Sequence, residues 1–276
     1  MIRYVDCNAT HPGDGSKSRP FRTISQAAFV AQAGDQVLVA PGIYREEVSP
    51  RWAGTKDAPI VYRSAEPRAA VITGAEPVKD WVHFQEDVWM VTIPNDAFGN
   101  YNPYTTLVWG DWLDQIVPCH TGDVFLGEKS LYEQDSLEKV LHPVEDESSW
   151  DKEFTKHTWY TAQSEDGEST LIYANFQGKN PNQEDVEITY RPHCFYPAQE
   201  HVNYITLTGF VVTKAATQWA PPTALQDGMI GPHWSKGWVI ENCEVSNSKC
   251  SGISLGKYLQ QGNDNKWSHY KYKDGT

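Results

Sequence analysis

Residues 205–212 read ITLTGFVV, and residues 238–245 read WVIENCEV. In both stretches apolar residues stand at the first, third, sixth and eighth positions, and the stretches begin 33 residues apart. A spacing that returns at a fixed interval is typical of solenoids, in which each repeat forms one turn and stacks on its neighbour. The pair therefore predicts two successive rungs of a coil of short β-strands. Ile253 and Leu255 are expected to be the inward-facing pair of the next strand.

The first 74 residues predict one helix followed by short strands. Thr23 can cap the helix together with Gln26, apolar residues recur on one face from Ile24 to Ala31, and Gly34 is expected to end it. Short β-rich runs follow without intervening helices, at residues 36–39, 59–62 and 70–73. A helix placed before such strands covers the first rung of a right-handed parallel β-helix, which is the fold we expect here.

The middle of the chain has a different character. Longer alternating runs at residues 88–93, 169–174 and 185–190 are divided by turns rich in Gly, Asn, Asp and Pro, which predicts an inserted antiparallel β-sandwich. An acidic, poorly patterned stretch at 136–156 is expected to form a short helix or a mobile loop. The predicted fold is all-β. Residues 1–74 form the cap helix and first rungs, 75–200 form the sandwich, and 201–276 resume the β-helix.

Composition excludes several classes of function. A net charge of −13 leaves no basic surface for a nucleic-acid backbone, but it suits a neutral sugar. The five cysteines are odd in number and lack a Cys-x-x-Cys pair, and His193, His201 and His233 are too scattered for a metal site, so we expect no metal and no cofactor. Reduced cysteines favour a cytoplasmic location. Neither a signal peptide nor a membrane span is expected.

Several motifs together resemble β-xylosidases of glycoside hydrolase family 120. They stand in the family's order along the chain and are NYNPY (100–104), GDWL (110–113), IYANFQG (172–178), CFYP (194–197), ATQWAPPT (216–223) and IGPHWSKGW (230–238). The resemblance implies a retaining, exo-acting enzyme that releases xylose from xylo-oligosaccharides. It also implies a longer chain, a homo-oligomer, and an Asp nucleophile and Glu acid/base that lie beyond Thr276. The catalytic residues are therefore unknown here, and the present residues are expected to be inactive alone.

Tryptophans are the best candidates for the sugar pocket, because indole rings stack on the apolar faces of sugars. Trp112 matches a position where the family's sandwich borders the pocket, and Gly110 and Asp111 before it fit a loop tip. The loop from Gln218 to Lys236 is stiffened by three prolines. It carries the other candidates for binding substrate, Trp219, Trp234 and Gln226. For each of these, ordinary packing is the alternative.

Two other functions remain open on the sequence alone. One is a β-helix polysaccharide lyase, but clustered Asp ligands for calcium are missing from the sequence and the net charge would repel polyuronate. The other is a non-catalytic carbohydrate-binding or assembly module. Against that module stands the polar, aromatic sequence after Leu255, which offers no element to cover the last rung edge. A C-terminal remainder of the same enzyme is therefore the expected partner.

Overall fold

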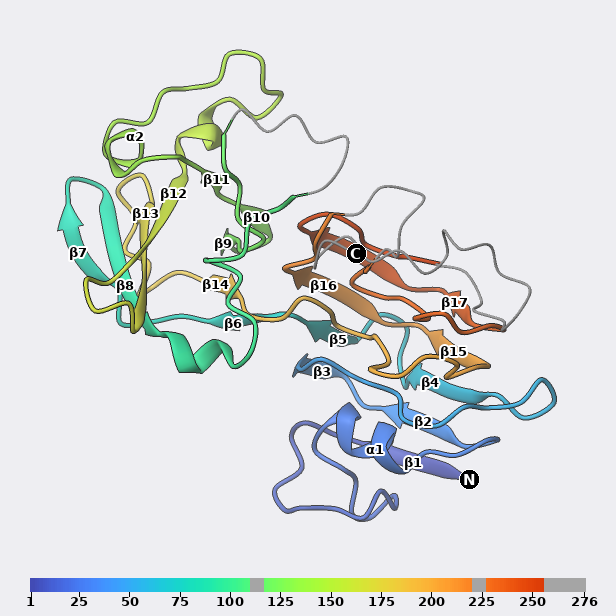
Figure 1. The fold of residues 1–276 in the computed structure, drawn as a ribbon. Coiled ribbons are helices and arrows are strands. Elements are labelled where there is room, and N and C mark those ends of the chain that lie inside the picture. The colour runs from blue at the N-terminus through green and yellow to red at the C-terminus, as the bar shows by residue number, and fades with distance from the viewer. Residues whose placement is uncertain (110–116, 220–226, 256–276) are drawn as a thin grey trace, which may run out of the picture. The chain divides into compact units, whose positions relative to one another are not determined.

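The structure is a computed structural model that describes residues 1–109, 117–219 and 227–255 (Figure 1). The chain divides into two compact units. Unit 1 comprises Met1–Gly74, Trp109–Trp112 and Arg191–Thr276, and unit 2 comprises Ala75–Val108 and Leu113–Tyr190. Within the described residues, no helix is both long and apolar enough to cross a membrane.

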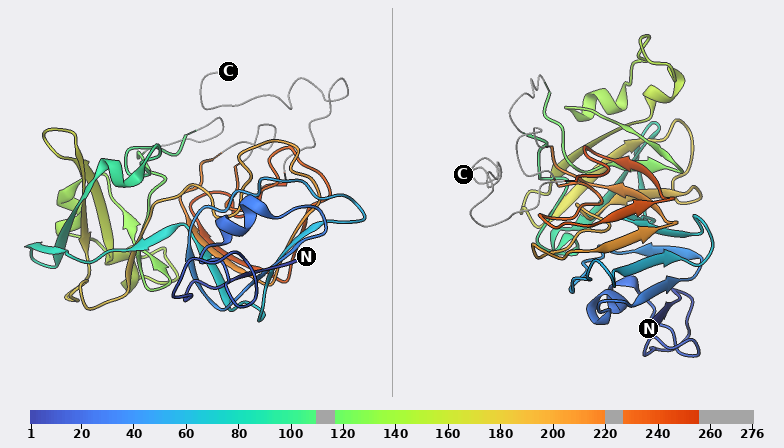
Figure 2. Two further views of the ribbon diagram at one scale, coloured as in Figure 1. Left: turned by 90° about the horizontal axis from the view of Figure 1, so that it is seen from below. Right: turned by 90° about the vertical axis from the view of Figure 1, so that its right-hand side faces the viewer.

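Unit 1 is a coil of parallel strands. One sheet has the order β1-β2-β4-β15-β17, with bounds Ile2–Val5, Gln36–Val39, Ile60–Ser64, Ile205–Thr208 and Val239–Glu241. The other has the order β18-β16-β5-β3, with bounds Glu244–Ser248, Val211–Ala215, Ala70–Thr73 and Gly42–Arg45. A third line of single parallel bridges joins Val48, Phe195, Ile230 and Ile253. The right view of Figure 2 shows the strands stacked in layers, which confirms the expected β-helix.

The predicted 33-residue repeat is confirmed by the strand register. Leu207 pairs with Ile240 and Val212 pairs with Val245, each 33 residues further along the chain. The corners of the rungs repeat at the same interval, because residues with positive φ recur in pairs 33 apart: His201 with Trp234, Tyr204 with Gly237, Gly209 with Asn242, and Lys214 with Asn247. Residues with left-handed backbone turn the chain at the corners of each rung. The corners therefore align when the rungs stack.

Helix α1 (Ile24–Val30) covers one end of this coil, as the left view of Figure 2 shows. The Thr23–Gln26 capping box is present as predicted. The expected end at Gly34 is wrong, because the helix ends at Val30 and Ala31 is its extended C-cap. Gly34 instead takes a positive φ of 83° in the turn that leads into β2. Ile24, Ala27 and Ala28 are buried and join the core of the coil.

Unit 2 is the expected β-sandwich. One sheet has the order β10-β9-β14-β6, with bounds Lys129–Ser130, Val124–Leu126, Val186–Thr189 and Ala75–Pro77. The other has the order β11-β12-β13-β8-β7, with bounds Tyr132–Glu133, Thr158–Gln163, Ser169–Asn175, Val88–Pro94 and Val82–Gln85. All pairs are antiparallel except β11 with β12. A core of its own, with Trp159, Ile172 and Ile188 fully buried, lies within this unit.

The acidic stretch of unit 2 forms short helices, α2 (Leu137–Leu141) and the 3₁₀ turn η2 (Glu153–Lys156); a further 3₁₀ turn, η1, spans Asn95–Phe98. The return to unit 1 differs from the expected boundary at residue 200. Residues from Arg191 onward already belong to the coil, because Phe195 pairs in parallel with Val48 and Ile230. A segment that pairs through a single bridge shows no alternating pattern in the sequence, which explains why the predicted boundary lies ten residues after the observed one.

Candidate functional site

Gln218 connects two of the tryptophan-bearing segments within unit 1. Its side-chain Oε1 accepts a hydrogen bond from the backbone N–H of Trp219 at 2.9 Å and another from the backbone N–H of Trp109 at 3.1 Å. Trp219 is half-buried just after β16, on the loop where it was predicted. Two of the other candidates, Trp112 and Gln226, do not belong to the described residues. The carboxamide of Gln218 thus fixes the backbone of Trp219 relative to Trp109.

Trp234, the fourth candidate, points into the protein. It is only 4% exposed, and both it and His233 take positive φ angles, of 59° and 46°. The His233 ring is held by a 2.7 Å contact between its Nδ1 and the carbonyl oxygen of Pro197. Two consecutive left-handed residues reverse the chain sharply, and this reversal is what buries the indole. Contact between Trp234 and a sugar stays a prediction.

A cluster of rings lies beside Trp234 on the third line of the coil. The phenol ring of Tyr196 stacks on His193, with ring centres 4.4 Å apart, and lies 5.2 Å from the ring of His233. The Tyr196 hydroxyl donates a 3.0 Å hydrogen bond to Oδ1 of Asp227. His193 Nδ1 lies 3.1 Å from Oε1 of Glu47. His193, Asp227 and His233 therefore contact one buried phenol, and Glu47 is connected to it through His193.

The electrostatics of this cluster keep the phenol protonated. Burial raises the pKa of Tyr196 far above its usual range, and the nearby Asp227 and Glu200 carboxylates raise that pKa further. A protonated phenol can only orient the Asp227 carboxylate, so Tyr196 acts as a fixed donor to it. Glycoside hydrolysis needs two facing carboxyl groups. Among the described residues, the contact found for Asp227 is this phenol and not a second carboxyl group.

The CFYP motif at 194–197 was recognised in the sequence, but no sequence pattern connects its Tyr196 with Asp227. Tyr196 and Asp227 are 31 residues apart and neither lies in a strand. Their contact arises because single bridges stack Phe195 on Ile230, and such bridges leave no periodic signal in the sequence.

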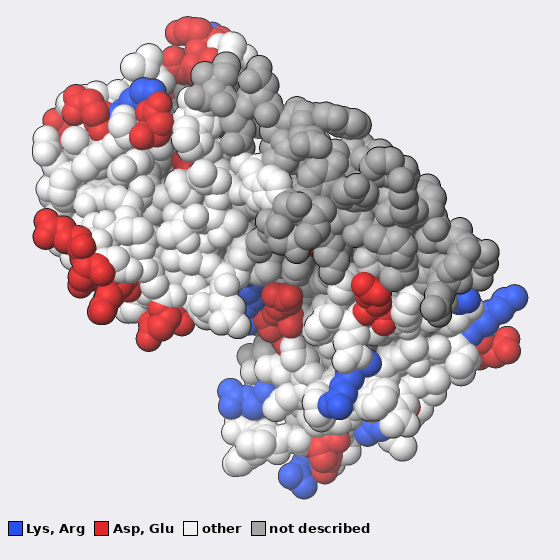
Figure 3. Space-filling model, in the orientation of Figure 1, with Lys and Arg blue, Asp and Glu red and all other residues white. Residues whose placement is uncertain are grey.

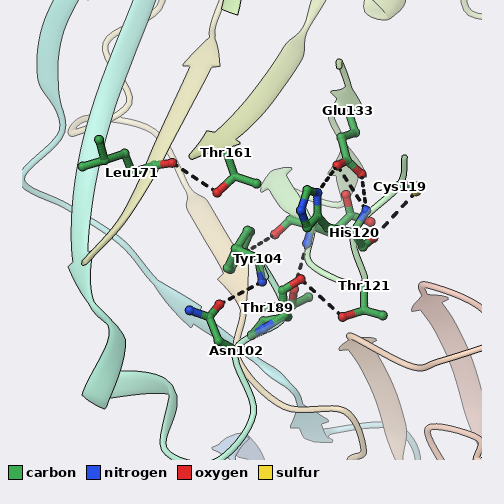
Figure 4. A network of polar contacts seen from close by, with 11 residues as sticks. Asn102, Tyr104, Cys119, His120, Thr121, Glu133, Thr161, Leu171 and Thr189 are labelled. Atoms are coloured by element: carbon green, nitrogen blue, oxygen red, sulfur yellow. Dashed lines mark hydrogen bonds and ion pairs between the residues drawn. The ribbon is translucent and has the colours of Figure 1, made fainter. Parts of the chain in front are cut away.

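Unit 2 contains a polar network around residues 106–108 and 119–121 (Figure 4). Residues 106–108 and 119–121 run antiparallel, with a bridge between Leu107 and His120. The Glu133 carboxylate accepts hydrogen bonds from the backbone N–H of His120 at 3.1 and 3.0 Å and contacts the ring Nδ1 at 2.6 Å. The Tyr104 hydroxyl donates to the carbonyl oxygen of Asp123 at 2.8 Å. This network ties the segments 106–108 and 119–121 to the sandwich.

The network is structural in character. Glu133 and His120 satisfy each other, and the described part of the chain contains no group of three or more His, Cys, Asp or Glu residues arranged to hold a metal ion. Burial raises the pKa of Tyr104 strongly, so its hydroxyl stays protonated and continues to donate.

Comparison with known proteins finds a match to a family model within each unit. Residues 78–188 match the family model for the insertion domain of glycoside hydrolase 120, and residues 7–52 match DUF1565, a family of unknown function. A solved structure described as the complex of XylC with xylose is 42% identical, with a TM-score of 0.86. That match covers 93% of this chain and 42% of the XylC chain.

Two further matches are weaker. An uncharacterized protein, YwoF of Bacillus subtilis (strain 168), is 37% identical over 71 residues, which are 26% of this chain and 15% of YwoF. A solved glycoside hydrolase superimposes with a TM-score of 0.46 at 12% identity over 79% of this chain and 51% of its own. The chain therefore spans less than half the length of XylC and about one seventh of YwoF.

Proposed function

The chain carries the glycoside hydrolase 120 insertion domain within a β-helix that it shares with XylC, and from this premise we propose that it is part of a β-xylosidase. The enzyme would release xylose from the ends of xylo-oligosaccharides with retention of configuration. The observation that carries the proposal is the 42% identity, over 93% of the chain, to a protein solved with xylose bound. In this proposal the chain supplies the sandwich, the early rungs and one wall of the sugar pocket.

Trp112, Trp219, Trp234 and Gln226 are the proposed substrate-binding residues. The position of Trp219 supports this role, because its indole is half-buried and its backbone is held by Gln218. A ring that is fixed before the sugar arrives loses little freedom on binding. The Asp nucleophile and the Glu acid/base are proposed to lie on further rungs, at the separation of about 5–5.5 Å that retention requires.

The edge of the coil at β17 and β18 supports the presence of further rungs. β17 and β18 are the end strands of their sheets among the described residues. Val48, Phe195 and Ile230 are fully buried on the third line, whereas Ile253, the next residue on that line, is 44% exposed and Leu255 is 74% exposed. Ile253 thus pairs with the buried Ile230 through a single bridge but is itself exposed, and no strand with Ile253 and Leu255 as its inward pair is present among the described residues. We propose that the C-terminal remainder of the enzyme stacks there as the partner of this chain.

The proposal also includes a location and an oligomeric state. A cytoplasmic location is proposed because the five cysteines are odd in number and lack a Cys-x-x-Cys pair. A homo-oligomer is proposed from the resemblance alone, and sedimentation of the intact enzyme that gave only monomer would contradict it.

Hydrolysis of an aryl β-xyloside by the enzyme that contains these residues tests the proposed activity. The Trp219→Ala variant is expected to lower kcat/KM by about tenfold, on the scale of one lost aromatic contact. The matched control is Trp52→Ala, which removes an exposed indole elsewhere in unit 1 and should leave kcat/KM unchanged. An enzyme that cleaved the corresponding aryl β-glucoside but not the xyloside would overturn the proposal. Unsaturated uronate products would indicate a lyase instead.

A further inference from the structure

The outer face of the larger sheet in unit 2 carries a strip of aromatic and apolar side chains. In the cross-strand register, Val82 pairs with Met90, Met90 with Tyr173, and Tyr173 with Tyr160. The next row aligns Thr92, Leu171 and Ala162. These positions lie opposite to the buried residues Val91, Ile172 and Trp159, because successive side chains of a strand alternate between faces. With Phe84 on β7, we call these eight residues the aromatic face.

The three rings of the aromatic face form a continuous strip. Phe84 contacts Tyr173 edge to face, with ring centres 5.1 Å apart, and Tyr160 lies 6.4 Å from Tyr173 with the two rings tilted by 31°. Phe84 is 42% exposed, and both tyrosines are half-buried. The row from Val82 to Tyr160 crosses four strands and therefore extends for about 14 Å. Several linked pyranose rings fill that length.

Helix α2 covers one end of this sheet face. α2 packs on β12 and β13, and the Asn175 side chain donates a 2.9 Å hydrogen bond to the carbonyl oxygen of Val140, which is fully buried. Tyr160 and Tyr173 lie one row further from this contact, and Thr92, Leu171 and Ala162 two rows further. The aromatic face therefore begins one row beyond the part of the sheet that α2 covers.

The charge of the aromatic face indicates its ligand. None of the eight side chains is ionisable at neutral pH, in a protein whose net charge is −13. Figure 3 shows the acidic side chains on the visible surface of unit 2, none of which belongs to these eight residues. A flat, neutral surface with two phenol hydroxyls can stack on the C–H faces of sugars and donate hydrogen bonds to their hydroxyls.

We propose that the aromatic face is a second carbohydrate-binding surface, separate from the proposed pocket, which holds a chain of β-linked neutral pyranoses. The choice of a xylose polymer as its ligand rests on the proposed function. A second copy of the protein fits the face less well. A standard protein interface takes about 20–30 residues a side, whereas the aromatic face has eight. The surface does no chemistry and would keep the polymer near the enzyme.

Native gel electrophoresis in the presence of soluble xylan tests this surface on the 276-residue protein. The wild type should be retarded by xylan, and the Phe84→Ala/Tyr173→Ala double variant should bind about tenfold more weakly, because it loses two of the three rings. Tyr173→Phe keeps the ring and should retain most of the retardation. Phe29→Ala, which removes an exposed ring of unit 1, is the matched control and should behave as the wild type.

Each result has a definite meaning. Unchanged retardation of the double variant, when its circular dichroism shows that it is folded, overturns the proposal. A double variant that changes sedimentation from dimer to monomer without losing retardation also overturns it, because the face would then join two copies. Failure of the proposed function appears elsewhere, in aryl-xyloside hydrolysis and its response to Trp219→Ala. The two proposals can therefore fail separately.

Discussion

Glu133 shows how a single residue can hold the segment around His120 in place. Its carboxylate receives the backbone N–H and the ring Nδ1 of His120, and its side chain is largely shielded from water. Hydrogen bonds to a charged, shielded acceptor are worth more than those at the surface. The local sequence around position 133 gives no sign of this role, because the partner is 13 residues away, on the other side of the β9–β10 hairpin.

Replacement of Glu133 by Gln should therefore destabilise unit 2. The amide keeps one acceptor oxygen but loses the charge, and we expect the free energy of unfolding to fall by about 1–2 kcal/mol. Urea denaturation followed by tryptophan fluorescence measures this change. Glu147→Gln removes a carboxylate that pairs with Lys152 at the surface and should cost less than about 0.5 kcal/mol. Equal costs for the two variants would contradict the assigned role.

Asp35 is the buried carboxylate at the entry to β2. Burial by itself raises its pKa, but hydrogen bonds from the N-terminal ammonium, the Gln32 backbone N–H and the Arg3 side chain together lower that pKa below its ordinary value. A carboxyl group whose pKa is lower in the folded state adds stability above its unfolded pKa, which is about 3.9. That stability is lost as the pH falls through the folded pKa.

The Asp35→Asn variant should show this dependence directly. The difference in unfolding free energy between wild type and variant is expected to be constant from about pH 6 to 8 and to shrink as the pH falls below about 5. Urea titrations at a series of pH values provide the measurement. Asp57→Asn removes an exposed carboxyl group of the same unit and should show a smaller dependence. A difference that grew toward acid pH would refute the assignment.

The candidate site was partly predictable at this scale. Trp219 lies half-buried on the expected loop, because a proline-rich insertion between rungs cannot join the strands. The inward position of Trp234 was not predictable, since it depends on left-handed backbone at a residue type that rarely adopts it. The contact between Tyr196 and Asp227 was not predictable for a related reason, because it depends on how the rungs stack and not on the local sequence pattern.

Among the elements, the strands that follow the 33-residue repeat could be predicted from the sequence, whereas the end of α1 could not. The 33-residue repeat predicted the pairing of β15 with β17 and of β16 with β18, because inward side chains of stacked rungs must have the same spacing. The strands at 36–39 and 70–73 were predicted with their observed bounds. The end of α1 was not, since Gly34 resembles a helix-ending glycine but serves the next turn.

Two corner glycines with similar backbone angles should respond differently to alanine. Gly209 has φ +79° and its nearest neighbour would be 3.6 Å from an added Cβ, so Gly209→Ala should cost only the conformational strain of about 1–2 kcal/mol. Gly237 has φ +69°, and an added Cβ would lie 2.3 Å from the ring of Tyr204, the residue one rung below. Gly237→Ala should therefore cost about 2–4 kcal/mol. Urea denaturation compares them, and a larger cost at Gly209 would contradict the corner alignment.

At the scale of the whole molecule, each unit has a hydrophobic core of its own, and in unit 1 that core is a stack of rungs. Residues of a middle rung, such as Leu207 and Val212, are fully buried, whereas their counterparts Ile240 and Val245 are only half-buried. A rung in a solenoid is stabilised by neighbours on both sides. Burial therefore measures how many neighbours each rung has among the described residues.

Ile230 and Ile253 allow a direct test, since they are the same residue type in adjacent rungs of the third line. Ile230 is fully buried, so Ile230→Ala should lower the unfolding free energy of the 276-residue chain by about 2–5 kcal/mol through lost packing and a cavity. Ile253 has one open side, so Ile253→Ala should cost less than about 1.5 kcal/mol in the same chain. In a protein that carries the proposed further rungs, the Ile253 side chain gains its second neighbour, and the cost of the same change should rise toward that at Ile230. Chemical denaturation of both variants in both proteins measures the four values. If the cost at Ile253 stays low in the longer protein, the next rung does not stack on this edge and the proposed continuation of the coil is wrong.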